Sequence, residues 1–402
     1  MFSDARPAPG TATSGLTMGV EEEFLLLHPR SGLPAPGATA VLRRAREQAG
    51  PAGTGRFQSE LFSTQLETAT GVCTTLDELE AQLTAARTRA AAAAGAEGLA
   101  LVASGGPADT AGLPAVSDEE RFAAITALYG GAMAEYQMCG CHVHVGVPDR
   151  ETAVAVVNQL GRWLPTLLAL SVNSPFHRGR DSGYGSWRTL EQARFPGSGI
   201  PPHFASAAAY DATVDSLQAS GVITDPAMSF WHARPSPHLP TVEFRAADSV
   251  GTVGEAVLQA ALARALVRTA LTELAAGREA PPLDGQVAAA AVWTAARDGL
   301  TGVGVDPLTH VRMPARRLLR LLLSHVADAL EETGDTRTVH GLLGTVARTG
   351  TGAERQREWW RRGGPCAVVK HLIRQTDPGG AAGALPAAPP GQPLAAHRRN
   401  SA

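Results

Sequence analysis

Gly19-Val20-Glu21-Glu22-Glu23-Phe24 combines acidic residues with the apolar spacing of a β-strand. Three later stretches share this character: Glu60 to Glu67, Cys139-Gly140-Cys141-His142-Val143-His144-Val145, and Thr241-Val242-Glu243-Phe244-Arg245. Side chains alternate between the two faces of a strand, so residues two apart share a face. Glu21 then lies with Glu23, His142 with His144, and Glu243 with Arg245. The pattern predicts a sheet with one apolar face and one acidic, metal-binding face.

Composition narrows the class of protein. The chain has 402 residues, of which 44% are hydrophobic, so it can bury a large core. Its net charge of -3 gives no reason to expect nucleic acid or an anionic membrane as a partner. We find no run of about 20 apolar residues and no signal peptide, and four cysteines do not make a disulfide framework. These observations predict a cytoplasmic protein.

The near absence of lysine excludes two classes of nucleotide-binding site. Lys370 is the only lysine, and all other side-chain cations at neutral pH are arginines. A P-loop requires Gly-Lys-Ser/Thr, and a protein kinase requires a lysine on a strand. Any nucleotide phosphates must therefore be neutralised by arginines and metal ions.

The order of predicted elements indicates an α+β fold. Residues 1–17 are expected to form a disordered leader, 18–377 one domain, and 378–402 a disordered Pro/Ala-rich tail. Strands are predicted at 20–27, 99–103, 137–147, 229–232 and 241–246, with an extended stretch at 57–70. Helices are predicted at 118–129 and after the capping residues Thr75, Thr252 and Thr351. Pro165 should break a long apolar helix, and 173–206 should be a long loop. Because no βαβ rhythm appears, we expect an antiparallel sheet.

The acidic residues form the candidate metal site. Hard cations such as Mg²⁺ take oxygen ligands, mostly carboxylates and substrate phosphates. The candidates are Glu21, Glu23, Glu60, Glu67 and Glu243. Glu60 and Glu67 are an odd number of residues apart, so a bulge or turn must separate them if both serve the site. Glu22 is expected to be solvated.

The cysteines and the histidines of residues 139–145 are expected on opposite faces of the predicted strand. Cys and His are zinc ligands, but alternation places Cys139 and Cys141 with Val143 and Val145, as small core residues. His142 and His144 share the opposite face and are candidates for binding a metal or a substrate. The alternative is that each is an ordinary polar group with a hydrogen-bond partner.

Four arginines are candidates for binding anions. Arg245 shares a face with Glu243, so it either forms a plain ion pair or reaches a reacting phosphoryl group. Arg188 and Arg234 are candidates for holding a substrate carboxylate. Arg355 follows the capping box of Thr351 and Glu354, where a helix N-terminus could bind an anion, although it could also simply be solvated.

These motifs together resemble a known family. Their order along the chain includes Gly19-Val20-Glu21-Glu22-Glu23-Phe24, Gly140-Cys141-His142-Val143-His144-Val145, Pro196-Gly197-Ser198-Gly199, Arg234-Pro235-Ser236, Thr241-Val242-Glu243-Phe244-Arg245 and Thr351-Gly352-Ala353-Glu354-Arg355-Gln356-Arg357. The chain resembles the glutamate–cysteine ligase type 2 family, the YbdK-like carboxylate–amine ligases, over residues 18 to 376. One departure is Gly105-Gly106-Pro107-Ala108-Asp109, which lacks a histidine that the family often carries near the expected acceptor pocket.

The resemblance implies a fold like the catalytic domain of glutamine synthetase, with a curved antiparallel sheet and helices behind it. It implies ATP and Mg²⁺ as cofactors, and acid and amine substrates of the amino-acid type, joined through an acyl-phosphate; weak glutamate–cysteine ligation is the usual activity. Carried over by motif, Glu21, Glu23, Glu60, His144 and Glu243 would bind metal, and Arg245 and Glu67 would be catalytic. The residues themselves make His142, Arg188, Arg234 and Arg355 the candidates for binding substrate or nucleotide.

Two other functions remain consistent with the residues. A zinc-dependent hydrolase would use His142, His144 and the glutamates to activate water. A non-catalytic nucleotide-binding relative would keep the sheet without turnover, and the altered segment 105–109 favours it. The long apolar helices could also bury a homodimer interface.

Overall fold

The computed structural model describes residues 16–47, 55–110 and 112–379, so the predicted leader and tail lie almost entirely outside the described residues. The strands are β1 (Met18–Leu27), β2 (Arg56–Ser59), β3 (Gln65–Ala69), β4 (Ala100–Val102), β5 (Gly140–Gly146), β6 (Phe176–His177), β7 (Arg180–Asp181), β8 (Ser198–Gly199), β9 (Phe230–Trp231), β10 (Ala233–Pro235), β11 (Thr241–Asp248), β12 (Val303–Val305) and β13 (Arg312–Pro314). The α-helices are α1 (Ala38–Glu47), α2 (Leu76–Ala96), α3 (Glu120–Tyr129), α4 (Arg150–Leu160), α5 (Leu164–Ser171), α6 (Trp187–Gln192), α7 (Ala207–Ala219), α8 (Val253–Ala275), α9 (Gly285–Asp298), α10 (Ala315–His325), α11 (Ala327–Glu332), α12 (Thr336–Thr349) and α13 (Gly352–Thr376). Two 3₁₀ turns are η1 (Gly130–Ala132) and η2 (Pro226–Met228).

The central element is a seven-stranded sheet in the order β10-β11-β5-β1-β3-β2, with β4 also paired to β1. Each pairing within it is antiparallel. The predicted acidic and histidine-bearing strands are therefore neighbours in the sheet. β1 lies between β5 and β3, and β5 lies between β11 and β1. The predicted α+β fold is confirmed.

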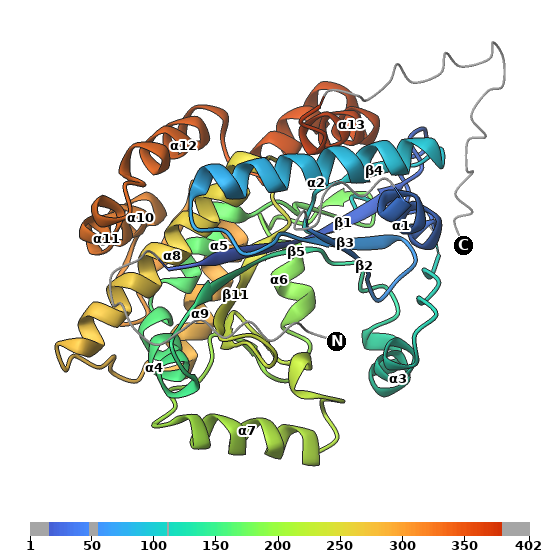
Figure 1. Ribbon diagram of the computed structural model, residues 1–402. Helices are drawn as coiled ribbons and strands as arrows, with labels where there is room; N and C mark the ends of the chain where they lie inside the picture. Colours follow the sequence, from blue (N-terminus) through green and yellow to red (C-terminus); the bar gives the residue numbers. More distant parts are fainter. Residues whose placement is uncertain (1–15, 48–54, 111, 380–402) are drawn as a thin grey trace, which may run out of the picture.

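One face of the sheet packs on helices. Val20, Val143 and Val145 are buried in one core cluster with leucines of α2 and with much of α8. Figure 1 shows α2 and α8 along this side of the sheet, whereas α3 and α7 lie on the other side. Cys141 belongs to the same cluster, so the expectation that it fills the core is confirmed. The period of two thus separates a helix-covered face from the face that carries the acidic residues.

Glu22 shows that the helix-covered face is not purely apolar. We expected this side chain to be solvated, and that expectation is wrong: neither Glu22 nor Arg87 of α2 is exposed. The Arg87 guanidinium donates two hydrogen bonds to the Glu22 carboxylate, at 3.0 and 2.6 Å. It also donates to the carbonyl oxygens of Val250 and Gly251. Alternation directs Glu22 away from its two acidic neighbours, into the layer where α2 supplies a partner.

Proline and capping residues set the predicted helix boundaries, and one predicted loop contains a helix that was not expected. The apolar helix breaks before Pro165, and α4 and α5 are bent by 69°. Thr75, Thr252 and Thr351 each form the predicted capping box. The prediction of a continuous loop over 173–206 is wrong in part, because Ser186 caps the short helix α6 through its side chain. Within the described residues, no single helix is long and apolar enough to cross a membrane. The bent pair of α4 and α5 has the length and composition of a membrane span when the two helices are taken together. The apolar side chains of this pair belong to the core.

Candidate active site

The register of the sheet brings the acidic and imidazole side chains together in pairs across strands. Glu21 of β1 lies opposite His142 of β5. His144 lies opposite Glu243 of β11, and Glu23 lies opposite Glu67 of β3. Side chains directly opposite each other in an antiparallel pair have Cβ atoms about 4.5–5.5 Å apart. Residues that are far apart in the sequence thus form one continuous polar surface.

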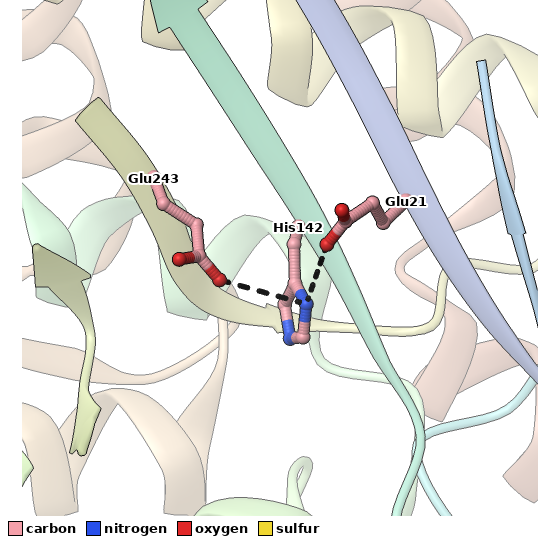
Figure 2. Close-up of side chains that lie close together, drawn as sticks. All are labelled: Glu21, His142 and Glu243. Atoms are coloured by element: carbon pink, nitrogen blue, oxygen red, sulfur yellow. Dashed lines mark ion pairs between the residues drawn. The ribbon is translucent and has the colours of Figure 1, made fainter. Parts of the chain in front are cut away.

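Two groups of these side chains have the geometry of a cation site. The ligand atoms of Glu21, His142 and Glu243 lie within 4.8 Å of one another, and so do those of Glu23, Glu67 and His142. Figure 2 shows the first group: the carboxylates of Glu21 and Glu243 approach the His142 ring from the neighbouring strands. The His142 Nδ1 atom is 3.6 Å from Glu21 and 4.0 Å from Glu243, and its Nε2 atom is 3.6 Å from Glu23.

The donor atoms fit a cation. Among the described residues, the buried Nε2 atoms of His142 and His144 have no hydrogen-bond partner. His144 is oriented through its other nitrogen, which is 2.9 Å from the Thr241 hydroxyl. Each of the two groups supplies two carboxylates and one imidazole. Carboxylate-rich sets suit hard ions such as Mg²⁺ and Mn²⁺, so the residues present fit the metal that the family implies.

Glu243 is held by two arginines. Arg234 donates to both of its carboxylate oxygens, at 2.7 and 3.1 Å, and Arg245 forms an ion pair with it from the same face of β11. Burial alone would raise the pKa of Glu243, but the charges of Arg234 and Arg245 hold it well below the usual range. Arg234 also donates to the carbonyl oxygens of Ala227 and Ser229. Arg234 is thereby committed to holding Glu243, whereas the Arg245 Nε atom forms no hydrogen bond among the described residues.

A β-bulge positions Arg245. The register of β11 against β5 shifts between Phe244 and Ala247, so β11 carries one extra residue there. The Arg245 backbone N–H bonds instead to the carbonyl of His232, at 2.8 Å. Bulges re-aim side chains and are common beside active sites. Here Arg245 itself lies in the bulge, two residues after Glu243.

Glu60 and Glu67 lie on either side of a turn, as their odd spacing required. Glu60 follows β2 and Glu67 lies in β3. Gln58 donates to the Glu67 carboxylate at 2.6 Å, and the Leu61 N–H donates to Glu60 at 2.8 Å. Burial and the neighbouring charge of Glu23 raise the pKa of Glu60 to about 7. Burial and the surrounding carboxylates also raise the pKa of Glu67 well above its usual value.

Mg²⁺ binding is expected to weaken as the pH falls from 8 to 6. A cation binds ionised carboxylates, and below its pKa of about 7 Glu60 is protonated, so the proton competes with the metal. Glu60 lines the cavity without belonging to either group, so it alone would reduce the affinity by at most about tenfold over this range, the factor by which its ionised fraction falls. Calorimetric titration with MgCl₂ at the two pH values measures the change. Glu60→Gln should flatten the dependence, and an affinity independent of pH in the unaltered protein would contradict the assignment.

Arg188 is a buried cation, and one of its two terminal nitrogens makes no hydrogen bond among the described residues. It projects from α6 and is 1% exposed. Its Nη2 donates to the Arg245 carbonyl at 3.2 Å, but its Nη1 has no hydrogen-bond partner among the described residues. The nearest acid is Asp248, whose oxygen is 3.9 Å from Nη1. Arg188 also lines the cavity, so its guanidinium can stabilise an anionic ligand there.

One cavity of about 840 Å³ contains these side chains. Its walls include the following predicted site residues: Glu21, Glu23, Glu60, Glu67, His142, His144, Arg188, Arg234, Glu243 and Arg245. This volume lies within the range of about 300–1,000 Å³ typical of small-molecule sites.

Arg355 is the predicted site residue that the structure does not bring to this cavity. It lies in α13, behind the sheet, where its guanidinium binds the Glu255 carboxylate at 2.9 Å and the Gln375 side chain at 2.7 Å. It also donates to the Gly350 carbonyl. Its place in the structure is a junction between α8 and α13, because Glu255 belongs to the capping box that begins α8.

The cavity also contains residues that were not predicted from the sequence. Gln58 precedes Glu60 by two residues, so the same-face rule could have identified it. Tyr136 and Gln192 also line the cavity, and no pattern in the sequence indicated them. The segment 105–109 does not line it; Gly105 packs on Asp248, where an added Cβ would lie 2.5 Å from the carboxyl carbon.

The comparisons with known proteins agree with this geometry. The model of glutamate–cysteine ligase family 2 matches residues 17–379. A protein of Saccharopolyspora erythraea, named "Putative glutamate–cysteine ligase 2-2", is 53% identical over 91% of this chain and 93% of its own length. A protein of Mycolicibacterium vanbaalenii with the same name is 46% identical over 86% and 93% of the two chains.

Solved structures show the same fold at low sequence identity. The glutamate–cysteine ligase of Francisella tularensis, determined in complex with AMP, superposes with a TM-score of 0.67 at 12% identity, covering 93% of this chain and 91% of the other. A bifunctional glutathione synthetase of Pasteurella multocida gives 0.66 at 14% identity, over 91% and 53%. With the family model spanning nearly the whole described chain, the protein belongs to glutamate–cysteine ligase family 2.

Proposed function

We propose that this protein is an ATP-dependent carboxylate–amine ligase that forms an amide bond through an acyl-phosphate and releases ADP. The observation that carries the proposal is the convergence of four carboxylates, His142 and Arg245 in one cavity of a glutamate–cysteine ligase fold. The ligase class comes from the family. ATP as the energy source, Mg²⁺ as the metal and weak glutamate–cysteine activity are parts of the proposal.

The chemistry has two steps. An oxygen of the substrate carboxylate attacks the γ-phosphorus of ATP, the bond to the bridging oxygen breaks, and ADP leaves. The amine nitrogen then attacks the acyl carbon of the acyl-phosphate, phosphate leaves with the bonding electrons, and the nitrogen loses a proton. Mg²⁺ bound by the carboxylates would neutralise phosphate charge during the first step.

The residues of the cavity have distinct parts in this scheme. Arg245 is placed to stabilise charge that develops on the transferred phosphoryl group, because its Nε is unpartnered among the described residues and lies beside the carboxylates. Arg234 positions Glu243. Glu67, with its raised pKa and its hydrogen bond from Gln58, is the candidate for proton transfer. Holding both substrates in one cavity supplies much of the rate enhancement.

Arg188 rather than Arg234 is the proposed anchor for a substrate carboxylate. Five hydrogen bonds occupy Arg234, whereas the Arg188 Nη1 atom has no hydrogen-bond partner among the described residues. A buried guanidinium binds a carboxylate through two parallel hydrogen bonds, which a lysine cannot reproduce. The anchor therefore depends on the shape of this side chain as well as on its charge.

Arg188→Lys is expected to raise the KM of the carboxylate-bearing substrate by about tenfold or more, because one charged hydrogen bond is lost while the charge is kept. The KM of ATP should stay nearly constant. Steady-state ADP release separates the two parameters, and Arg316→Lys, at an exposed position of α10, is the matched control. Unchanged KM values for every substrate would remove Arg188 from this role.

ADP release tests the main proposal. The purified protein is incubated with ATP and MgCl₂ and with pools of acids and amines, including glutamate plus cysteine. ADP formed only when an acid and an amine are both present supports ligation. Bound zinc without any ADP would favour the hydrolase. Each candidate group has two carboxylates and one imidazole, which suits an ion harder than zinc. ATP binding without turnover would favour the non-catalytic alternative. Dependence on ATP also suggests a cytoplasmic location, where ATP is supplied.

A further inference from the structure

One part of the cavity is apolar, and the reaction scheme above does not use it. We call it the apolar compartment; its walls are Leu61, Phe122, Ile125, Met133, Met138 and Met228. Each of these side chains is less than a tenth exposed, although each faces the cavity. They come from the turn after β2, from α3 and the residue after η1, from the segment before β5, and from η2. Separate elements of the chain thus converge to build this wall.

The apolar compartment lies at one end of the metal-binding face. Met138 lies two residues before β5, whose first residue is Gly140 and whose last is Gly146. Six residue steps of about 3.3 Å place these strand ends roughly 20 Å apart. The cavity wall near the other end contains Gly19, Gly146 and Thr241, together with His238, Leu239 and Pro240. The two histidines lie between the ends, so a triphosphate held beside them has the apolar compartment on one side.

Charged and polar groups at the border of the apolar compartment suit the head groups of a substrate. Glu60 directly precedes Leu61, and both line the cavity. Arg188 and Gln192 line it as well, and the Arg188 Nη1 and Gln192 Oε1 atoms are buried without a hydrogen-bond partner among the described residues. An amine reaches the site as an ammonium cation, and the Glu60 carboxylate can stabilise that charge. The apolar surface next to Glu60 therefore suits the remainder of the amine.

We propose that the amine substrate carries a bulky apolar or aromatic group, which the apolar compartment receives. This inference rests on the proposed ligase function and specifies its acceptor. The side chain of cysteine is too small to cover six apolar walls, and unfilled contacts contribute no binding. Burial of apolar surface is the main source of affinity in such a pocket, so acceptors should be ranked by apolar size.

The experiment compares amines that differ only in apolar size. ADP release is measured with ATP, MgCl₂ and L-glutamate, using ethylamine against phenethylamine, and L-alanine and L-cysteine against L-leucine and L-phenylalanine. Calorimetry measures binding of ethylamine and phenethylamine to the same protein. We expect kcat/KM to favour the large member of each pair by about 100-fold, since one methylene in such a pocket is worth about 10–200-fold.

Ile125→Trp fills the apolar compartment and is expected to raise the KM of phenethylamine by about tenfold or more, while the KM of ATP stays unchanged. Ala124→Trp, on the exposed side of α3, is the matched control. Ile125→Ala is a second variant that keeps the helix and should admit larger amines. Equal kcat/KM and equal affinity across the sizes would overturn the inference. If no pair yields ADP, the ligase proposal fails. The binding curves then test the apolar compartment alone, and similar affinities for ethylamine and phenethylamine would refute its proposed role.

Discussion

Glu21→Gln is expected to lower the rate of ADP release by about 100- to 1,000-fold, the loss typical when one preorganised charge-stabilising group is removed from an active site. The change deletes one negative charge from the metal-binding face but keeps the shape of the side chain. Glu21 lies 3.6 Å from His142 and 3.4 Å from His144, so it belongs to the centre of the site. Burial opposes its ionisation, yet the two imidazoles hold the pKa of Glu21 well below its usual range. It is therefore charged at neutral pH.

Glu21 is a cleaner test than Glu243. Neutralising Glu243 would leave the buried charges of Arg234 and Arg245 without their shared partner, and the fold would lose stability together with the activity. Glu80→Gln on the exposed side of α2 is the matched control and should keep full activity. ADP release and the thermal midpoint are measured for each variant. Unchanged turnover in Glu21→Gln, in a protein that melts normally, would refute the proposed role of the metal-binding face.

Arg87→Met is expected to lower the free energy of unfolding by about 3–5 kcal/mol, because it leaves the Glu22 carboxylate buried without its counter-ion. Two hydrogen bonds from Arg87 to Val250 and Gly251 are lost as well. Urea denaturation followed by circular dichroism measures the change. Arg43→Met is the control, since the Arg43–Glu47 ion pair on α1 is exposed and such pairs contribute less than about 1 kcal/mol.

The double variant Arg87→Met, Glu22→Leu identifies the cause of this loss. If an unpaired charge is responsible, removing Glu22 as well should recover most of the stability, since apolar pairs of similar volume often replace buried ion pairs without a net cost. If the double variant is as unstable as Arg87→Met alone, the bonds from Arg87 to the carbonyls dominate instead. A loss below about 1 kcal/mol in Arg87→Met would show that the pair is not critical to stability.

Local rules predicted much of the fold. Alternation placed Glu21, Glu23, His142 and His144 on one face, and the odd spacing of Glu60 and Glu67 required the turn that separates β2 from β3. Pro165 and the capping threonines set helix boundaries. These features depend on residues close together in the sequence, where strand period and backbone chemistry act directly.

Features set by distant contacts could not be predicted. Alternation shows that Glu22 points away from Glu21, but only the position of α2 determines that Arg87 meets it there. Arg355 follows a helix start that resembles an anion site, yet the tertiary structure brings Glu255 of α8 to it as a partner. The pairing of Glu23 with Glu67 requires the strand order, and the apolar compartment requires the position of α3.

The two groups of candidate ligands share a single imidazole. A neutral His142 ring has one nitrogen with a lone pair and one that carries hydrogen. Its Nδ1 faces Glu21 and Glu243, whereas its Nε2 faces Glu23. If a cation occupied each group, the tautomer of this one side chain would decide which of the two it binds. The other cation would then need water or an oxygen of the nucleotide to complete its coordination, so we expect the number of ions held to rise when nucleotide enters.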